Sequence, residues 1–273
     1  MNEENMFISL IEVGGFNGAL FGMRNPLNSW GLSDSKYTLD ENNVPNFEIG
    51  ERDLDLCKRL IKGGREHRKF LRMIYVQFNF NAPRYIWSEF DTYKIGTVTN
   101  SCSTMHKLLN KDDEVREYSH MYDDLLATQG DLTLKNFYYD KKDEEILQIV
   151  IDRINILREE YVKSKNPKDK KDLLRRAKQL LPESYLQMRT VSTNYEVLIN
   201  IYQQRKHHRL DKEWGLFCRF VEELPYMKEF LEISDLKWNV VLKDVITKQN
   251  ISLEETVDTI VVDIYITCID MDI

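Results

Sequence analysis

The stretch that decides the fold is residues 180–213, which read LLPESYLQMRTVSTNYEVLINIYQQRKHHRLDKE. No proline or glycine interrupts the run from Asn194 to Trp214, and Thr193 is a suitable N-cap. The sequence therefore predicts one continuous helix over Asn194–Trp214. Its apolar residues recur at helical spacing and are expected to pack inward: Val197, Leu198, Ile201 and Tyr202.

The same predicted helix carries a polar stripe. Asn194 and Arg205 are spaced so that they project from nearly the same side, and His208 follows one turn later. A guanidinium binds a phosphate or an enolate-like carbonyl, and amides read the edge of a heterocycle, so this stripe suits a planar, anionic ligand. An exposed polar helix face would show the same residues.

A second informative block lies between residues 61 and 105. Alternating apolar residues predict a strand over Leu71–Asn81, and Pro83 suits the first turn of a following helix that Gly96 ends. The segment Thr97–Thr104, TVTNSCST, reads as a hydroxyl-rich turn. Hydroxyls and free backbone N–H groups bind phosphate well, although serines and threonines also cluster in ordinary caps and loops.

Together the two blocks resemble the flavin-dependent thymidylate synthases (ThyX). The C-terminal signature of that family is matched by Leu181-Pro182, Thr193-Asn194, Leu198, Asn200, Arg205, His208 and Glu213, and its strand–helix segment resembles residues 61–105. The resemblance implies a ThyX-like α+β fold with a central antiparallel or mixed sheet flanked by long helices. It implies a single domain over 1–273, with a helical elaboration at about 106–180 and a C-terminal extension at about 233–273.

The resemblance also implies roles for individual residues. Arg205 stands where the family has the arginine that contacts and polarises the pyrimidine, so it is the candidate catalytic residue. Candidate substrate ligands are Arg84, Glu89, Ser101, Cys102, Ser103, Thr104, Lys178 and Arg205. Candidate cofactor ligands are Thr92, Tyr93, Lys94, Asn194, Asn200 and His208. Cys102 also offers a thiol nucleophile for the pyrimidine ring, a role that the family does not give it.

The chain departs from the family where cations are expected. Thr92, Tyr93 and Lys94 replace an Arg-His-Arg motif, and Glu196 replaces an arginine. Glu89 replaces a substrate-binding glutamine. Each loss of a guanidinium removes a charge-assisted contact to the flavin phosphates. The fold is therefore better supported than the chemistry.

Three functions fit these observations. The first is one-carbon transfer, as methyl or hydroxymethyl, to C5 of dUMP or a close pyrimidine nucleotide, with FAD and a folate donor implied by the resemblance. The second is a non-catalytic protein that senses or sequesters a nucleotide on the same fold. The third is a structural oligomer without a ligand. The family builds its sites between subunits, so a homotetramer is expected.

Composition narrows the remaining possibilities. The net charge of −7 argues against a surface that binds duplex nucleic acid. No apolar window is long enough to span a membrane, and the acidic N-terminus does not resemble a signal peptide, which favours the cytoplasm. The cysteines, Cys57, Cys102, Cys218 and Cys268, are too scattered for a zinc motif, so no metal site is expected.

Outside the two blocks, the periodicity predicts three amphipathic helices, at 51–62, 143–163 and 168–181. The basic residues of the third helix read mostly as a solvated face, with Arg176 or Lys178 as the candidates to contact an anion. The Gly-rich segment from Gly14 to Pro26 predicts a loop, and Thr256–Met271 predicts a strand.

Overall fold

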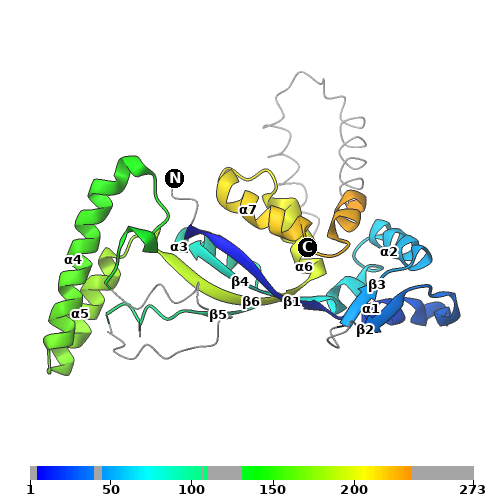
Figure 1. The fold of residues 1–273 in the computed structure, drawn as a ribbon, viewed down its shortest axis with the longest axis horizontal. Coiled ribbons are helices and arrows are strands. Elements are labelled where there is room, and N and C mark those ends of the chain that lie inside the picture. The colour runs from blue at the N-terminus through cyan, green and yellow to red at the C-terminus, as the bar shows by residue number, and fades with distance from the viewer. Residues whose placement is uncertain (1–4, 40–44, 106, 110–130, 235–273) are drawn as a thin grey trace, which may run out of the picture.

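The structure is a computed structural model that describes residues 5–39, 45–105, 107–109 and 131–234. A four-stranded sheet occupies the middle of the molecule, a pair of long helices lies at one end, and a small unit of two helices and two short strands lies at the other (Figure 1). The arrangement is α+β, which confirms the predicted fold class.

The central sheet is antiparallel throughout, with the strand order β1-β4-β6-β5. Its strands are β1 (Phe7–Gly14), β4 (Tyr75–Pro83), β5 (Val98–Ser101) and β6 (Leu186–Asn194). A separate two-stranded sheet pairs β2 (Lys36–Leu39) with β3 (Pro45–Glu48).

The α-helices are α1 (Phe16–Arg24), α2 (Glu51–Gly63), α3 (Arg84–Phe90), α4 (Glu144–Lys163), α5 (Pro167–Leu180), α6 (Tyr195–Arg205) and α7 (Asp211–Glu222). Residues 227–234 are also helical. Short 3-10 helices cover Asn25–Leu27, Trp30–Leu32, Lys69–Met73, Leu134–Asn136 and Lys141–Asp143. The predicted helices at 51–62, 143–163 and 168–181 are thus confirmed as α2, α4 and α5.

Strand β4 is the centre of the core. Val76, Phe78 and Phe80 alternate along it and are fully buried, as the sequence pattern predicts. The ring of Phe78 lies 4.9 Å from the ring of Phe220. Phe220 belongs to α7, the helix that covers this face of the sheet. On the other face, the hydroxyl of Thr190 donates to Asn79 at 2.7 Å. One face of the sheet therefore packs under helices and the other presents polar groups, as is common for antiparallel sheets.

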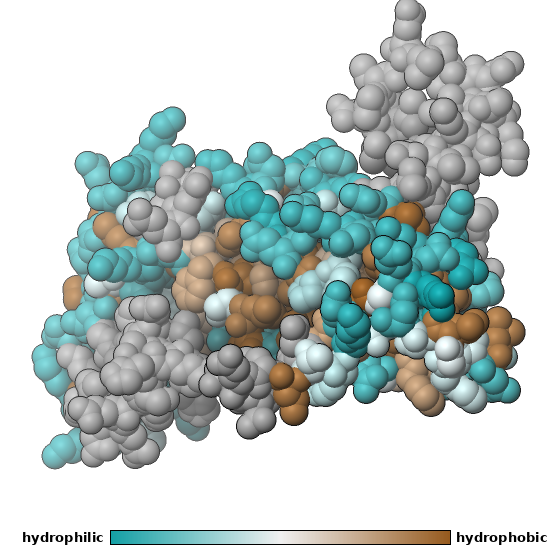
Figure 2. All heavy atoms as spheres, turned by 45° about the vertical axis from the view of Figure 1, so that its right-hand side comes forward, coloured by the Kyte–Doolittle hydropathy of each residue, from teal (hydrophilic) through white to brown (hydrophobic). Residues whose placement is uncertain are grey.

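The pair α4 and α5 has a hydrophobic cluster of its own. Ile151, Ile154 and Leu157 of α4 pack with Leu173 and Ala177 of α5, and all five are buried. On the face shown in Figure 2, hydrophilic side chains cover most of the surface and apolar ones gather near its centre.

The Gly-rich segment is a helix, so the predicted loop over Gly14–Pro26 is wrong. Phe16, Ala19 and Leu20 of α1 recur at helical spacing and are buried in the main core, and their burial outweighs the low helix propensity of the glycines between them. Gly15 begins the helix with φ of 88°, a conformation that favours glycine.

Two predicted boundaries on the sheet also change. The predicted strand over Leu71–Asn81 begins later, at Tyr75, because Lys69–Met73 forms a 3-10 turn. The predicted hydroxyl-rich turn at Thr97–Thr104 is largely the edge strand β5, whose backbone pairs with β6. Its partner β6 was not predicted, although Thr190, Val191 and Thr193 are β-branched residues that favour strands.

The predicted single helix over Asn194–Trp214 is two helices. The first begins at Asn194, whose side chain accepts from Val197 N at 3.1 Å, so the N-cap is Asn194 and not Thr193. It ends at Arg205, and Nδ1 of His208 accepts from Leu210 N at 3.2 Å in the turn before α7. That local side-chain hydrogen bond competes with continuation of the helix. The helix therefore ends here although the segment contains no proline or glycine.

The two segments that carry the family resemblance lie side by side at this point, since Tyr195 N donates to Ile74 O at 3.0 Å. The predicted strand at Thr256–Met271 and Cys268 lie outside the described residues. The single-domain assignment stays a prediction. Within the residues that the structure describes, no helix combines the length and the apolar character needed to cross a bilayer.

A buried ion pair holds the small unit together. Arg24 of α1 lies 2.6 Å from Asp53 of α2, and their exposed fractions are 5% and 0%. Asp53 also accepts from the hydroxyls of Ser33 and Ser35 at 2.6 Å. Burial raises the pKa of Asp53, but the hydrogen bonds from the two serines and Arg24 outweigh it and lower the pKa below the usual 3.8.

We predict that Asp53→Asn lowers the free energy of unfolding at neutral pH by about 3–5 kcal/mol, because it leaves Arg24 buried without a counter-charge. The folded-state pKa is lowered, so the carboxylate stabilises the protein above pH 3.8 and this stabilisation is lost as the pH falls through the lower folded value. Urea unfolding at a series of pH values should therefore show the difference between wild type and variant shrinking in acid.

The control is Asp55→Asn, which removes an exposed pair with Arg59. Its cost should stay below about 1 kcal/mol. Equal losses for the two variants would contradict a structural role for the buried pair.

Candidate functional site

The ends of two helices meet at an arginine–glutamate pair. Nη1 of Arg205, the last residue of α6, lies 2.8 Å from Oε2 of Glu89 near the end of α3. The indole N–H of Trp214, from the first turn of α7, donates to the same oxygen at 3.0 Å. Three helices therefore supply one cluster, although their residues lie far apart in the sequence.

Aromatic groups orient the arginine. Its Nε donates to the hydroxyl of Tyr93 at 2.8 Å, and that hydroxyl donates to Gln204 at 3.0 Å. The guanidinium carbon lies 4.6 Å above the ring of Trp214 and 5.5 Å from that of Tyr93. These contacts fix the plane of the guanidinium of Arg205, which favours directional hydrogen bonds over simple charge attraction.

The cluster remains open to a ligand. The side chains of Arg205, Glu89 and His208 are 15%, 31% and 26% exposed, and Nε2 of His208 lies 3.6 Å from Glu89 Oε2. The Arg205 guanidinium at the end of α6 is also favoured by the free carbonyls of that helix end. Opposite charges and partial exposure make this a polar, preorganised cluster.

A tyrosine–glutamate contact borders the cluster. The hydroxyl of Tyr85, on α3, donates to Oε1 of Glu213 on α7. Burial, together with this carboxylate, raises the pKa of Tyr85 far above its usual range. Tyr85 is therefore a neutral donor that fastens α3 to α7, beside Trp214.

The structure thus brings together Arg205, Glu89, Tyr93 and His208 of the candidate residues. The other candidates on α3 and α6 have local roles. The hydroxyl of Thr92 donates to the Glu89 carbonyl at 2.7 Å, and Asn200 accepts from Gln204 at 3.3 Å. Lys94 is exposed and follows Tyr93 along the chain. Asn194 caps the far end of α6, about 16 Å from Arg205 along the helix, so the predicted polar stripe is not one contiguous surface.

The candidate phosphate ligands lie on the sheet edge. Ser101 ends β5 opposite Arg189 of β6, and Cys102 N donates to Met188 O at 2.9 Å. Nζ of Lys178 lies 3.1 Å from Sδ of Met105, so the end of α5 reaches the segment that holds Ser103 and Thr104. Within the described residues, no hydrogen bond or ion pair connects this segment to Arg205. Arg84 instead pairs with Glu183 at 3.2 Å.

Cys102 is a poor nucleophile in this structure. Solvent reaches the residue, but partial desolvation of its thiol raises the pKa above the usual 9.0, and Lys107 offsets this only in part. Since the thiolate is the reactive form, the thiol is mostly protonated at neutral pH.

Sequence reasoning missed two residues of these surfaces, Trp214 and Arg189. Arg189 lies beside Ser101, pairs with Asp91 at 2.7 Å and covers the ring of Trp87 at 4.4 Å. Its position follows only from strand β6, whose β-branched residues were the available signal. Trp214 was visible only as the end of a predicted helix.

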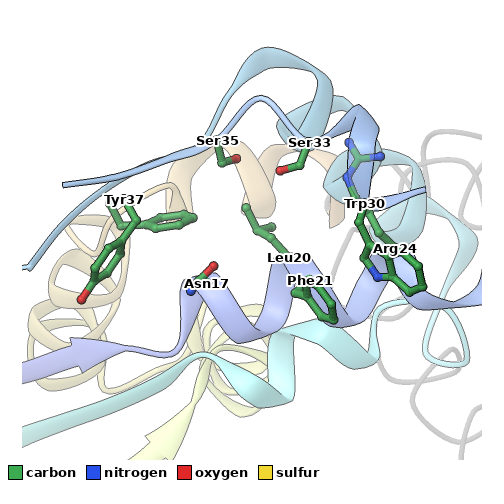
Figure 3. A pocket seen from close by; sticks show the side chains of 9 residues that line it. Asn17, Leu20, Phe21, Arg24, Trp30, Ser33, Ser35 and Tyr37 are labelled. Atoms are coloured by element: carbon green, nitrogen blue, oxygen red, sulfur yellow. The ribbon is translucent and has the colours of Figure 1, made fainter. Parts of the chain in front are cut away.

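Two cavities lie outside the Arg205 cluster. The larger, of about 420 Å³, lies between α3 and the start of α4 and includes Tyr85, Tyr138 and Tyr139 in its lining. The smaller, of about 80 Å³, lies between α1 and the segment before β3, where α1 residues Asn17, Leu20 and Phe21 face Ser33, Ser35 and Tyr37 (Figure 3).

Comparison with known proteins identifies the fold. No protein-family model and no curated protein sequence matches this chain. Among solved structures, the chain is similar to the flavin-dependent thymidylate synthase ThyX from Helicobacter pylori complexed with FAD and dUMP, at a TM-score of 0.56 and 19% identity over 83% of this chain and 97% of that one.

A second structure of ThyX from Helicobacter pylori, with FAD and dUMP, gives a TM-score of 0.56 and 18% identity over 84% of this chain and 99% of that one. The fold of this chain is therefore ThyX-like. At this identity the likeness concerns the fold alone, so the activity has to be argued from the residues themselves.

Proposed function

We propose that this protein binds a pyrimidine nucleotide, dUMP or a close analogue, at the Arg205 cluster and transfers a one-carbon unit to C5 of its base. The observation that carries the proposal is the preorganised, partly exposed pair of Arg205 and Glu89, held by Tyr93 and Trp214. The ThyX-like fold and the neighbours solved with dUMP support the choice of ligand.

Arg205 would orient and polarise the base. Its Nη2 has no partner among the described residues and can donate to a ring nitrogen or carbonyl oxygen of the ligand. Withdrawing electron density there makes C5 more acidic and helps it to act as a carbanion equivalent. The nucleotide phosphate would bind at the sheet edge, where Ser101, Ser103 and Thr104 supply hydroxyls and Lys178 and Arg189 supply charge.

The residues present do not fit the flavin of the neighbours. Glu196 stands where the resemblance places a cation, and it forms an internal ion pair with Arg68 at 3.0 Å with its side chain 11% exposed. The hydroxyl of Tyr93 is occupied by Arg205 and Gln204, and the side chain of Asn194 caps α6. A flavin diphosphate would meet Glu196 and only one cation, Lys94, at these positions.

Hydroxymethyl transfer is the one-carbon outcome that agrees with this misfit. A folate donor carries its methylene at the oxidation level of formaldehyde, so replacing the C5 hydrogen by a hydroxymethyl group needs water and no reductant. Transfer of a methyl group needs two more electrons, which a flavin would supply.

A second candidate, a nucleotide-binding protein without catalysis, is favoured by one observation. Glu89 neutralises Arg205 at 2.8 Å, which weakens the polarising field that C5 chemistry requires. Such a protein would bind the same nucleotide and leave it unchanged. Incubation with a folate donor and mass measurement of the nucleotide separates the two candidates.

We also propose that the protein is a homo-oligomer, in line with the homotetramer expected from the family resemblance. Helix α4 buries Ile151, Ile154 and Leu157 against α5, yet a second stripe of isoleucines is exposed. Ile146, Ile149 and Ile156 are 67%, 69% and 47% exposed. A helix that is apolar on two faces commonly buries the second in an interface.

The first prediction from the proposed function concerns Arg205. Arg205→Ala should weaken binding of dUMP or dCMP by about 1.5–3 kcal/mol, because it removes a charge-assisted hydrogen bond. Arg205→Lys should recover only part of this, since an ammonium lacks the planar fork. Calorimetric titration measures the affinities, and circular dichroism checks the fold.

Arg59→Ala is the matched control, because Arg59 forms an exposed pair with Asp55. Equal nucleotide affinity for wild type and Arg205→Ala would remove Arg205 from the site.

The second prediction concerns the flavin. The purified protein should show no flavin absorption, and titrated FAD should keep its fluorescence, since Glu196 and Tyr93 are engaged internally. FAD that stays bound in one-to-one ratio through desalting would contradict the misfit and favour the flavin-dependent reaction.

The third prediction concerns assembly. Light scattering should give wild type the mass of a tetramer, and Ile149→Asp should yield a smaller species, because a charge cannot be buried in an apolar interface without a large cost. Leu27→Asp is the control, since Leu27 is 84% exposed on a different element. A wild-type monomer at micromolar concentration would refute the oligomer.

A further inference from the structure

We propose that Glu89 makes the site select a pyrimidine with a 4-amino group, of the cytosine type, over one with a 4-oxo group, of the uracil type. The inference rests on the proposed binding of a pyrimidine nucleotide at the Arg205 cluster, and it narrows the class of base that binds there.

Glu89 has one oxygen committed and one available. Oε2 receives Arg205 Nη1 at 2.8 Å and Trp214 Nε1 at 3.0 Å. In the described part of the chain, no group donates to Oε1, and the side chain is 31% exposed. The two donors hold the carboxylate in one orientation, so Oε1 is presented in a fixed direction. Nη2 of Arg205, on the guanidinium that binds Oε2, also has no partner among the described residues.

A carboxylate differs from an amide in what it can meet. Ionised glutamate accepts hydrogen bonds and donates none, whereas glutamine can turn its amide to do either. The Glu89–Arg205 pair therefore offers an acceptor next to a donor, in that order. An amide at position 89 would let the site offer two donors instead.

The two kinds of base present opposite patterns at positions 4 and 3. Cytosine has an amino donor at position 4 and an acceptor nitrogen at position 3, which match Glu89 and Arg205 respectively. Uracil has a carbonyl acceptor at position 4 and an N–H donor at position 3. Its acceptor would therefore face the carboxylate of Glu89, and its donor would face the guanidinium of Arg205. Acceptance of the cytosine amino group by glutamate or aspartate is a common form of base recognition.

Uracil can reach a matching pattern only by sliding one ring atom along the pair. Its N–H would then face Glu89, and its 2-oxygen would face Arg205. This register leaves the 4-oxygen beside the carboxylate without a donor, and desolvating two facing acceptors is unfavourable. It also displaces C5 from its position in the matched register, so any one-carbon donor would be out of line.

Calorimetric titration with dCMP and dUMP tests the inference on three proteins. Wild type should bind dCMP about tenfold more tightly than dUMP. Glu89→Gln should reduce or abolish this preference, because the amide can donate to a 4-oxygen as well as accept from a 4-amino group. Asp91→Asn is the matched control, because it also replaces a carboxylate by an amide at the end of α3. Asp91 pairs with Arg189 and not with Arg205. It should keep the wild-type ratio.

Each other outcome has a definite meaning. Wild type that binds dUMP as tightly as dCMP, or an unchanged ratio in Glu89→Gln, overturns the selection by Glu89 and leaves pyrimidine-nucleotide binding standing. If wild type binds neither nucleotide, the proposed function fails and the inference fails with it. If Glu89→Gln does not fold, because Glu89 also holds Trp214, the wild-type ratio alone decides.

Discussion

The antiparallel register of β4 with β6 is the constraint on which the rest of the structure depends. It pairs Tyr75 with Asn194 and Pro83 with Leu186, so α3 and α6 leave the sheet from opposite ends of the same strand pair. The strands span about 30 Å, and helices of these lengths span about 10 Å and 16 Å. Because both helices come back toward the middle, their last residues meet, and Glu89 reaches Arg205.

The elements that could be predicted from the sequence are those whose buried apolar residues recur at a regular spacing. The alternation of Val76, Phe78 and Phe80 predicts β4, and the apolar stripes of α2, α4 and α5 predict those helices. Strand β6 and the helical state of the Gly-rich segment could not be read in the same way, because they depend on partners distant in the sequence. The same holds for the site: the family resemblance marks Arg205 and Glu89 separately, but only the fold shows that they form a pair.

Three arginine–carboxylate pairs in this protein show how burial distinguishes their roles. In Arg24–Asp53 both partners are buried and every carboxylate oxygen is used, so the pair can only stabilise the fold. Arg68–Glu196 is nearly as enclosed, at 16% and 11% exposed. Arg205–Glu89 leaves one carboxylate oxygen and one guanidinium nitrogen without a partner among the described residues, and its side chains are 15% and 31% exposed. The same chemistry is therefore structural in two places and suited to recognition in the third.

The place of α4 and α5 in the chain affects how the sheet can assemble. The hydrogen bond between Thr190 and Asn79 joins residues that are 111 positions apart, so pairing β6 with β4 closes a long loop. The helical pair lies inside that loop and is stabilised by its own local contacts. Local contacts form early in folding, and a compact hairpin shortens the effective loop and lowers the entropy lost on closure. A helical pair that forms early would therefore shorten the loop that β6 has to close when it pairs with β4.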